Sequence, residues 1–286
     1  MKKYQKEVTI VLISHRSKKK VLKFIKKLSK KTKIIIIENS KDKQIKKSVL
    51  KVNKKIKIKF SNNKGYGSAI NLARNLVNTN YFFVFNPDVK KVSNNLIENF
   101  YYAAKKLNNN FGVLGPRFIY PNKKSEKKQS NINKKIGEIH SISGSALFFN
   151  KKVFDINKGF DENFFLYFEE TDYCVRARKN GYNTYQLNNE KVIHEMGKSV
   201  EFINKKEEEK VKDLLIWHFI WSKFYYYRKH YTYGLSLIFF TPTLIRTIFR
   251  IIIYYFFSNR IKLQKYKTRL SGLINSMLLK KAFKRV

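Results

Sequence analysis

The first part of the chain alternates short apolar runs with segments of helical periodicity. β-Branched and aromatic residues dominate the apolar runs, which cover residues 8–13, 33–37, 56–60 and 81–85. Between them, residues 18–28 and 68–77 repeat apolar side chains at helical spacing. Helices that separate short buried strands are typical of a parallel sheet with right-handed crossovers. The alternation therefore predicts an α/β fold.

Polar side chains follow each expected strand. His15 comes after the first, Glu38 after the second, residues 62–67 after the third, and Asn86 and Asp88 after the fourth. Ligands bind beyond the carboxyl ends of the strands in such sheets, so we expect a nucleotide-type ligand there. Taken alone, Asp88 also fits an ordinary turn or helix cap, and the glycines of 62–67 also fit a simple turn.

Carboxylates are scarce in this chain but concentrate in one segment. The chain has 61 Lys and Arg against 20 Asp and Glu, a formal net charge of +41. Residues 159–181 nevertheless contain Asp161, Glu162, Glu169, Glu170 and Asp172. Adjacent carboxylates raise one another's pKa, a cost typical of sites that hold a cation or take up a proton. We expect acid–base or metal chemistry here.

The positive charge is spread along the chain and does not form one stripe. A solvated Lys-rich surface is the preferred explanation, followed by an anionic membrane surface, with nucleic acid the least favoured partner. The single cysteine, Cys174, excludes an internal disulfide, suits a reducing compartment and is expected to pack within a helix. The apolar run after the polar residues 1–7 is too short for a signal peptide.

A set of short motifs occurs in a specific order. They are VTIVLISH (8–15), IIIIENS (34–40), NKGYGSAIN (63–71), NPDV (86–89), GSALFF (144–149), GFDE (159–162) and His194. Over residues 8–200 this set resembles the family 2 glycosyltransferases of the GT-A fold, in their rhamnosyltransferase-like branch. The resemblance implies an α/β catalytic domain whose mostly parallel sheet is flanked by helices.

The resemblance implies that a nucleoside-diphosphate sugar donor binds along the strand ends. In the family the acidic residue that ends the second strand contacts the base, and Glu38 stands here where Asp is commoner. His15 is expected to stack on the base. The implied donor-binding residues are Ser14, His15, Glu38, Asn39, Asn63, Gly65, Asn86 and Gly144.

The same resemblance implies a divalent cation. The family's Asp-x-Asp motif stands here as Asn86-Pro87-Asp88, so Asp88 is its remaining carboxylate. Mg²⁺ or Mn²⁺ is expected, because a hard cation with oxygen ligands can neutralise a departing diphosphate. His194 matches the position where related enzymes place a His near the metal or diphosphate, although a single His after an apolar strand is more often structural. Asp88 and His194 are the predicted metal ligands.

The resemblance also implies a catalytic base. Glu169-Glu170 stands where the family has Glu-Asp, whose second member is the general base. Glu170 is therefore the predicted base, with Glu169 as its competitor, since the extra methylene moves the carboxyl by about a bond length. Asp172 and Arg176 are four residues apart and are expected to form an orienting ion pair. Direct displacement would invert the anomeric configuration.

Two further regions carry expectations of their own. Residues 120–141 are polar without a clear period and predict a mobile loop over the site, which either clamps the acceptor or is a solvated insertion. Beyond residue 200 the composition changes, which predicts a catalytic domain at 1–200 and a basic, aromatic helical region at 201–286.

The C-terminal region contains a long apolar segment. Residues 234–257 follow an aromatic and basic stretch, and residues 262–284 form a second basic amphipathic segment. Such a pattern is typical of helices in the membrane interface. Arg246 and Arg250 would each cost about 2.5 to 3.5 kcal/mol in a true span, so we prefer interfacial docking to a span or a soluble packing helix.

These features predict an inverting, metal-dependent glycosyltransferase. The expected donor is dTDP-rhamnose, and the expected acceptor is a lipid-linked or cell-envelope saccharide. The protein is expected on the cytoplasmic face of the membrane, where an anionic surface would hold it peripherally. The alternatives are a UDP-hexose transferase of the same family, a non-catalytic glycan- or membrane-binding pseudoenzyme, and a basic nucleic-acid-binding protein.

Overall fold

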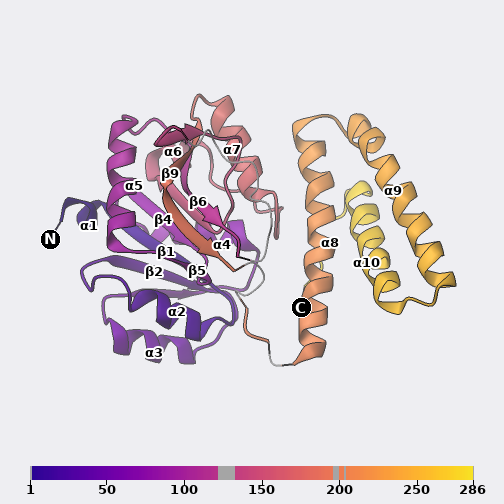
Figure 1. Ribbon diagram of the computed structural model, residues 1–286, viewed down its shortest axis with the longest axis horizontal. Helices are drawn as coiled ribbons and strands as arrows, with labels where there is room; N and C mark the ends of the chain where they lie inside the picture. Colours follow the sequence, from indigo (N-terminus) through magenta and orange to yellow (C-terminus); the bar gives the residue numbers. More distant parts are fainter. Residues whose placement is uncertain (1, 122–132, 196–199, 203, 286) are drawn as a thin grey trace. The chain divides into compact units, whose positions relative to one another are not determined.

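The chain divides into two compact units, which Figure 1 shows as a sheet flanked by helices and a group of helices. The computed structural model describes residues 2–121, 133–195, 200–202 and 204–285. The first unit comprises residues 1–161 and 170–201, and the second comprises residues 162–169 and 202–286. The sequence placed residues 162–169 in the first domain, whereas in the structure they group with the helices of the second unit.

The first four strands run parallel, as the sequence predicts. They are β1 (Val8–Ser14), β2 (Lys33–Glu38), β3 (Lys57–Phe60) and β4 (Tyr81–Phe85). β1 lies between β2 and β4, and β3 pairs with the other side of β2. The register places Ser14 opposite Glu38, so these two strands end level with each other. The predicted α/β class is confirmed.

The other half of the sheet is mixed. It contains β5 (Val89–Lys90), β6 (Val113–Ile119), β7 (Ile136–Glu138), β8 (Ala146–Asn150) and β9 (Thr184–His194). β8 runs antiparallel between β4 and β6, while β9 runs parallel to β6 and antiparallel to β5 and β7. Within the described residues the strand order is β3-β2-β1-β4-β8-β6-β9-β5, with β7 beside β9.

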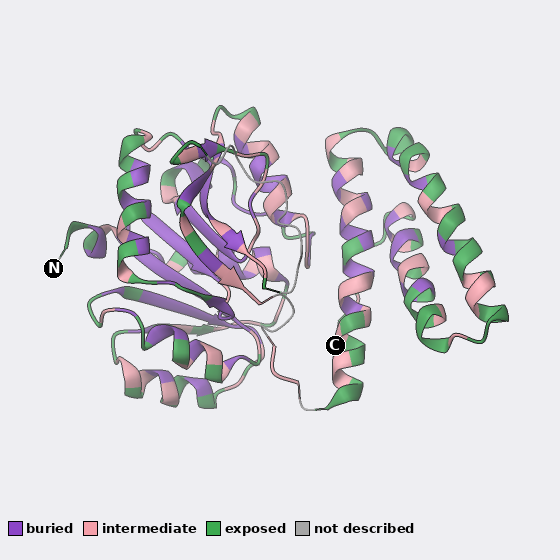
Figure 2. Ribbon diagram, viewed as in Figure 1, coloured by how far each residue is buried: buried purple, intermediate pink, exposed green. Residues whose placement is uncertain are grey.

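Helices cover the sheet (Figure 1), and the core between them is rich in aromatic residues. The helices of the first unit are α1 (Lys3–Glu7), α2 (Lys18–Ile25), α3 (Gln44–Val52), α4 (Tyr66–Leu76), α5 (Asn94–Lys106), α6 (Lys151–Ile156) and α7 (Glu169–Lys179). Figure 2 shows the strands buried and the helices exposed on their outer faces. Phe82 stacks on Phe149 with ring centroids 5.0 Å apart, so paired rings join β4 to its antiparallel neighbour β8.

The polar tract at 120–141 is not a loop throughout. β7 lies inside it and pairs with β9, Ile136 opposite Leu187 and Glu138 opposite Tyr185. The expectation of a loop is therefore wrong for this part of the tract, where backbone hydrogen bonds to β9 outweigh the polar composition. Residues 122–132, on which the rest of that expectation falls, lie outside the described residues.

The second unit contains three long helices and the segment 162–169. Its helices are α8 (Lys205–His230), α9 (Tyr233–Phe256) and α10 (Arg260–Met277). Phe165 packs in a buried cluster with Trp217 and Trp221 of α8, and the Ser222 hydroxyl donates to the carbonyl of Leu166 at 2.7 Å. Tyr167 and Phe168 both have left-handed backbone conformations, with φ of 69° and 68°. Aromatic packing on α8 explains why this segment groups with the helices.

α9 exposes most of its apolar side chains (Figure 2). Among the described helices, α9 is long and apolar enough to cross a membrane, with a mean hydropathy of 1.6. Only 17% of this apolar stretch is buried. Ile238, Ile245 and Phe249 are 67%, 61% and 61% exposed. The exposed face is compatible with membrane association.

His218 of α8 makes the second unit sensitive to acid. It is fully buried beside Phe165, and its Nε2 lies 2.9 Å from the Lys284 carbonyl, so Nε2 carries the proton of the neutral ring. Burial lowers the pKa of His218 from 6.5 to about 4. Between pH 6.5 and about pH 4, unfolding of the protein is therefore accompanied by protonation of His218. The contribution of His218 to the free energy of unfolding is present above pH 6.5 and is lost as the pH falls toward 4.

We expect His218→Gln to remove this part of the pH dependence. The wild-type free energy of unfolding should fall by roughly 3 kcal/mol more than that of the variant between pH 6.5 and pH 4. Urea unfolding at several pH values measures the difference. Parallel pH profiles for the two proteins would show that His218 does not cause it.

Candidate active site at the strand ends

Glu38 is held in place where β1 and β2 end. Its Oε2 accepts the Ser14 hydroxyl at 2.5 Å, and its Oε1 accepts the Ser40 N–H at 2.8 Å and the Ser40 hydroxyl. Glu38 and Ser14 are both 0% exposed. The two serines therefore fix the carboxylate of the predicted base-contacting residue below the surface.

His15 and Asn39 follow these two strands directly. The Asn39 N–H donates to the Ser14 carbonyl at 2.8 Å, which extends the β1–β2 pairing by one residue. Asn39 is buried and His15 is half-buried. Burial, together with the charge of Arg16, lowers the pKa of the His15 imidazole, so the ring is neutral near pH 7. A neutral flat ring beside the strand ends is suited to the stacking role predicted for His15.

Asn63 and Gly65 form the turn between β3 and α4. Asn63 has φ of 44°, and Gly65, the residue that caps α4, has φ of 119°. The conformation of Gly65 is one that side-chain-bearing residues rarely adopt, which explains the glycine. The turn leads into the N-terminus of an eleven-residue helix, whose first backbone N–H groups have no partner within the helix, an arrangement that favours anions.

α4 ties the predicted motifs to one another. The Tyr66 hydroxyl donates to the carbonyl of Gly144 at 2.5 Å. The Asn71 side chain accepts the N–H of Phe160 and donates to its carbonyl, both at 2.9 Å. Three motifs that are far apart in the chain, at 63–71, 144–149 and 159–162, are thus joined by hydrogen bonds from one helix.

The two predicted metal ligands lie next to each other. β5 pairs with β9 so that Val89 faces His194, and His194 Nε2 lies 3.6 Å from Asp88 Oδ2. Asn86, in the same turn, donates its N–H to the Ser145 carbonyl at 3.0 Å. A carboxylate oxygen is a suitable ligand for Mn²⁺ or Mg²⁺, and an imidazole nitrogen beside it suits Mn²⁺ better than Mg²⁺, which prefers oxygen ligands. The described residues contain no group of three or more His, Cys, Asp or Glu side chains placed to hold a metal ion.

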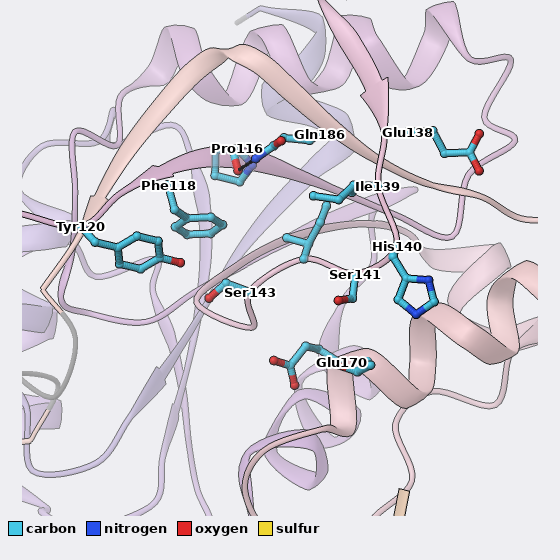
Figure 3. A pocket seen from close by; sticks show the side chains of 12 residues that line it. Pro116, Phe118, Tyr120, Glu138, Ile139, His140, Ser141, Ser143, Glu170 and Gln186 are labelled. Carbon is cyan, nitrogen blue, oxygen red and sulfur yellow. Dashed lines mark hydrogen bonds between the residues drawn. The ribbon is translucent and has the colours of Figure 1, made fainter. Parts of the chain in front are cut away.

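A cavity of about 460 Å³ lies between β6, residues 139–143 and the start of α7. Figure 3 shows Glu170 on the same side as Ser141 and Ser143, with Phe118 and Tyr120 toward one end and His140 toward the other. A Cβ added to Gly144 would lie 3.7 Å from the Glu170 Cδ. The predicted base, Glu170, therefore borders the cavity, and Gly144 lies close to Glu170.

Glu169 has a different environment from Glu170. It is 4% exposed and does not line the cavity, whereas Glu170 is half-buried and does. The two carboxylates are adjacent in the chain, but the helix that begins at Glu169 turns their side chains in different directions. This geometry separates the two candidates that the sequence left open.

Residues of the cavity wall connect to the Asp88–His194 pair. The rings of Phe118 and Tyr120 lie 6.4 and 6.0 Å from the His194 ring. Ser143, which lines the cavity, has its hydroxyl 3.1 Å from that of Ser145, and the Ser145 hydroxyl is 3.5 Å from His194 Nδ1. The predicted base and the predicted metal ligands are thus near one cavity.

Sequence reasoning missed most residues of the cavity wall. They are Pro116, Phe118, Tyr120, Glu138, His140, Ser143 and Gln186. These side chains lie on or beside β6, β7 and β9, which pair with one another. The apolar run Val113–Ile119 was the available signal, since residues that follow a buried strand would again be expected at the site.

α7 is anchored by the predicted ion pair. Arg176 Nε lies 2.8 Å from Asp172 Oδ2, which confirms that pair. The same guanidinium donates to the carbonyls of Gly159, at 2.7 Å, and of Asn157. Cys174 of the same helix is fully buried, which confirms that it packs in the core, and burial raises the pKa of its thiol to about 11.

Comparison with solved structures identifies the fold. The structure of S. aureus TarS 1-349 in complex with UDP-GlcNAc matches with a TM-score of 0.53 and 13% identity, over 96% of this chain and 92% of that one. S. aureus TarS matches with a TM-score of 0.54 and 12% identity, over 73% of this chain, which spans 39% of that longer chain.

A third match is GalNAc-T7 with UDP, GalNAc and Mn²⁺, with a TM-score of 0.54, 9% identity, and coverage of 78% of this chain and 51% of that one. No protein-family model matches the sequence, and no curated protein matches it. At these identities the likeness concerns architecture, and it confirms the predicted GT-A fold.

Asn71 should be important for stability because it holds the start of the acidic segment. In Asn71→Asp a carboxylate oxygen would replace the N–H₂ that faces the Phe160 carbonyl, so we expect a loss of about 1 to 3 kcal/mol in the free energy of unfolding. Urea unfolding measures it, with Asn62→Asp in the exposed loop as the matched control. Equal losses in the two variants would contradict the assignment.

Proposed function

We propose that this protein is an inverting, metal-dependent glycosyltransferase that moves a sugar from a nucleoside diphosphate to a saccharide acceptor. The observation that carries the proposal is that Glu170 lines a cavity of a GT-A fold whose wall residues Phe118 and Tyr120 contact the ring of His194, the neighbour of Asp88. Structural neighbours solved with UDP, UDP-GlcNAc or UDP, GalNAc and Mn²⁺ support a nucleotide-sugar donor.

Glu170 is the proposed general base. Its carboxylate takes the proton of an acceptor hydroxyl while that oxygen bonds to the anomeric carbon, and the bond from this carbon to the diphosphate oxygen breaks. The attacking oxygen and the diphosphate are on opposite faces of the sugar, so the configuration inverts. Glu170, half-buried in the cavity wall, is accessible for this proton transfer, whereas Glu169 is 4% exposed.

The strand ends are the proposed donor site. His15 would stack on the base, Glu38 would accept its N–H, and the turn that contains Gly65 would face the phosphates. Asp88 and His194 would hold Mg²⁺ or Mn²⁺. When bound, the cation would neutralise the negative charge of the leaving nucleoside diphosphate.

Two different observations bear on the identity of the donor sugar. The ordered sequence motifs favour rhamnose from dTDP-rhamnose, while the UDP complexes of the structural neighbours favour a UDP-hexose. A thermal-shift panel of nucleotide sugars with Mn²⁺ distinguishes them, because a bound donor stabilises the folded state. If none of the donors stabilised the protein, the pseudoenzyme alternative would be favoured.

The acceptor is proposed to be lipid-linked, with the protein held peripherally on the cytoplasmic face of the membrane. The exposed apolar side chains of α9 support this location, since water-soluble surfaces seldom carry so many large apolar groups on one helix. Arg246 and Arg250 on the same helix are also exposed and would favour anionic headgroups over a full span.

Glu170→Gln tests the catalytic assignment. We expect the transfer rate to fall by about 10²- to 10⁴-fold with little change in the KM for the donor, because only the proton acceptor is removed. Glu169→Gln is the matched control and should retain most of the activity. Sugar transfer is measured with the donor that gives the largest thermal shift. An unchanged rate in Glu170→Gln, or equal losses in both variants, would refute the assignment.

Asp88→Asn tests the metal assignment. At UDP concentrations near 100 times its Kd, UDP with Mn²⁺ should stabilise the wild type by about 2.7 kcal/mol, and the variant should lose the Mn²⁺-dependent part. Asp213→Asn makes the same chemical change in the second unit, outside the predicted metal ligands. Titration calorimetry of UDP with and without Mn²⁺ gives the result. Retention of the metal effect in Asp88→Asn would exclude this ligand.

A further inference from the structure

The second unit contains a pocket of its own, lined by apolar residues and two cations. Its volume is about 240 Å³. α8 contributes Leu215, Ile216 and Phe219, α10 contributes Lys265 and Arg269, and Tyr167 comes from the segment 162–169. Lys265 and Arg269 are one helical turn apart and share a face of α10. The pocket is therefore apolar on the α8 side and positively charged on the α10 side.

Arg269 is an unusual residue for such a position. It is half-buried, and its Nε is buried without a hydrogen-bond partner among the described residues. Burial, with the positive charges of Arg250 and Arg246 on α9, lowers the pKa of its guanidinium. A cation held partly out of water and next to other cations is unfavourable unless an anion compensates it.

Among the described residues, no carboxylate forms an ion pair with these cations. Arg250 directs its guanidinium to the Tyr266 hydroxyl and over the Tyr266 ring, 5.2 Å from the centroid. Within the described ranges, none of Arg246, Arg250, Lys265 and Arg269 forms an ion pair. An external anion is the compensation that this arrangement fits.

We infer that the pocket between α8 and α10 binds the phosphate head of a membrane lipid. Lys265 and Arg269 would contact the phosphate oxygens, and Leu215, Ile216 and Phe219 would contact the first part of the apolar chain. A free phosphate would use only the charged side of the pocket, whereas a lipid phosphate matches both sides. The helix α9 packs against α10. Its exposed apolar face would lie in the same membrane as the bound lipid.

This inference rests on the proposed membrane-held acceptor and adds to it the chemical class of the lipid. It concerns binding alone and requires neither the donor nor Glu170. Its test therefore uses the full chain without any nucleotide sugar. Failure of lipid binding would leave the transfer assignments intact, and failure of transfer would leave the lipid result intact.

The test is titration calorimetry of the full chain with dihexanoyl phosphatidic acid, a short-chain lipid phosphate, kept below its micelle concentration. Dihexanoyl phosphatidylcholine has the same chains without net charge, and inorganic phosphate has the charge without chains. We expect phosphatidic acid to bind at least tenfold more tightly than either. Equal affinity for inorganic phosphate would show a free-anion site, and equal affinity for phosphatidylcholine a purely apolar site; either result overturns the inference.

Matched variants distinguish the pocket from general positive charge. The double variant Lys265→Gln with Arg269→Gln should weaken phosphatidic acid binding at least tenfold. The single variant Lys265→Gln should weaken it severalfold, and because this side chain is exposed the change should not affect folding. Arg260→Gln with Lys267→Gln removes the same two charges from exposed positions of α10 outside the pocket and should change affinity less than twofold. Equal losses in both double variants would overturn the inference.

Discussion

The pairing of β9 with three other strands determines most of the site. Its first part pairs with β7 and its last residues with β5, while β6 runs beside it throughout. The register of β6 on β9 shifts between Pro116 and Arg117, where the partner residue moves from Leu187 to Lys191. The end of β9 is thereby brought level with β5, so that backbone pairing of the two strands brings His194 next to Asp88.

The sequence was sufficient to predict the parallel half of the sheet. Its strands are short β-branched runs separated by helices, and parallel pairing brings their ends together, so Ser14, Glu38 and Asp88 could be placed at one edge before the structure was known. The ion pair between Asp172 and Arg176 was predictable for a similar reason, because its spacing within one helix fixes the distance. Local periodicity carried both kinds of information.

The rest of the site depends on contacts between distant segments. No local pattern shows that Val89 will pair with His194, or that the tract after β6 contains a strand that pairs with β9. The different surroundings of Glu169 and Glu170 arise where α7 begins, and the motif alone does not specify which of the two lines the cavity. The order of the motifs identifies the candidate site residues. The pairing of distant strands decides which of these residues lie near the cavity.

The left-handed turn at Tyr167 and Phe168 constrains how this chain can vary. Glycine would adopt these dihedral angles without strain, whereas each larger residue costs on the order of 1 kcal/mol or more. The Tyr167 and Phe168 rings contact Phe219, at 5.5 and 5.7 Å, and this packing offsets the strain. A glycine here would relieve the backbone but remove the contact, so the three aromatic positions should change together in related sequences.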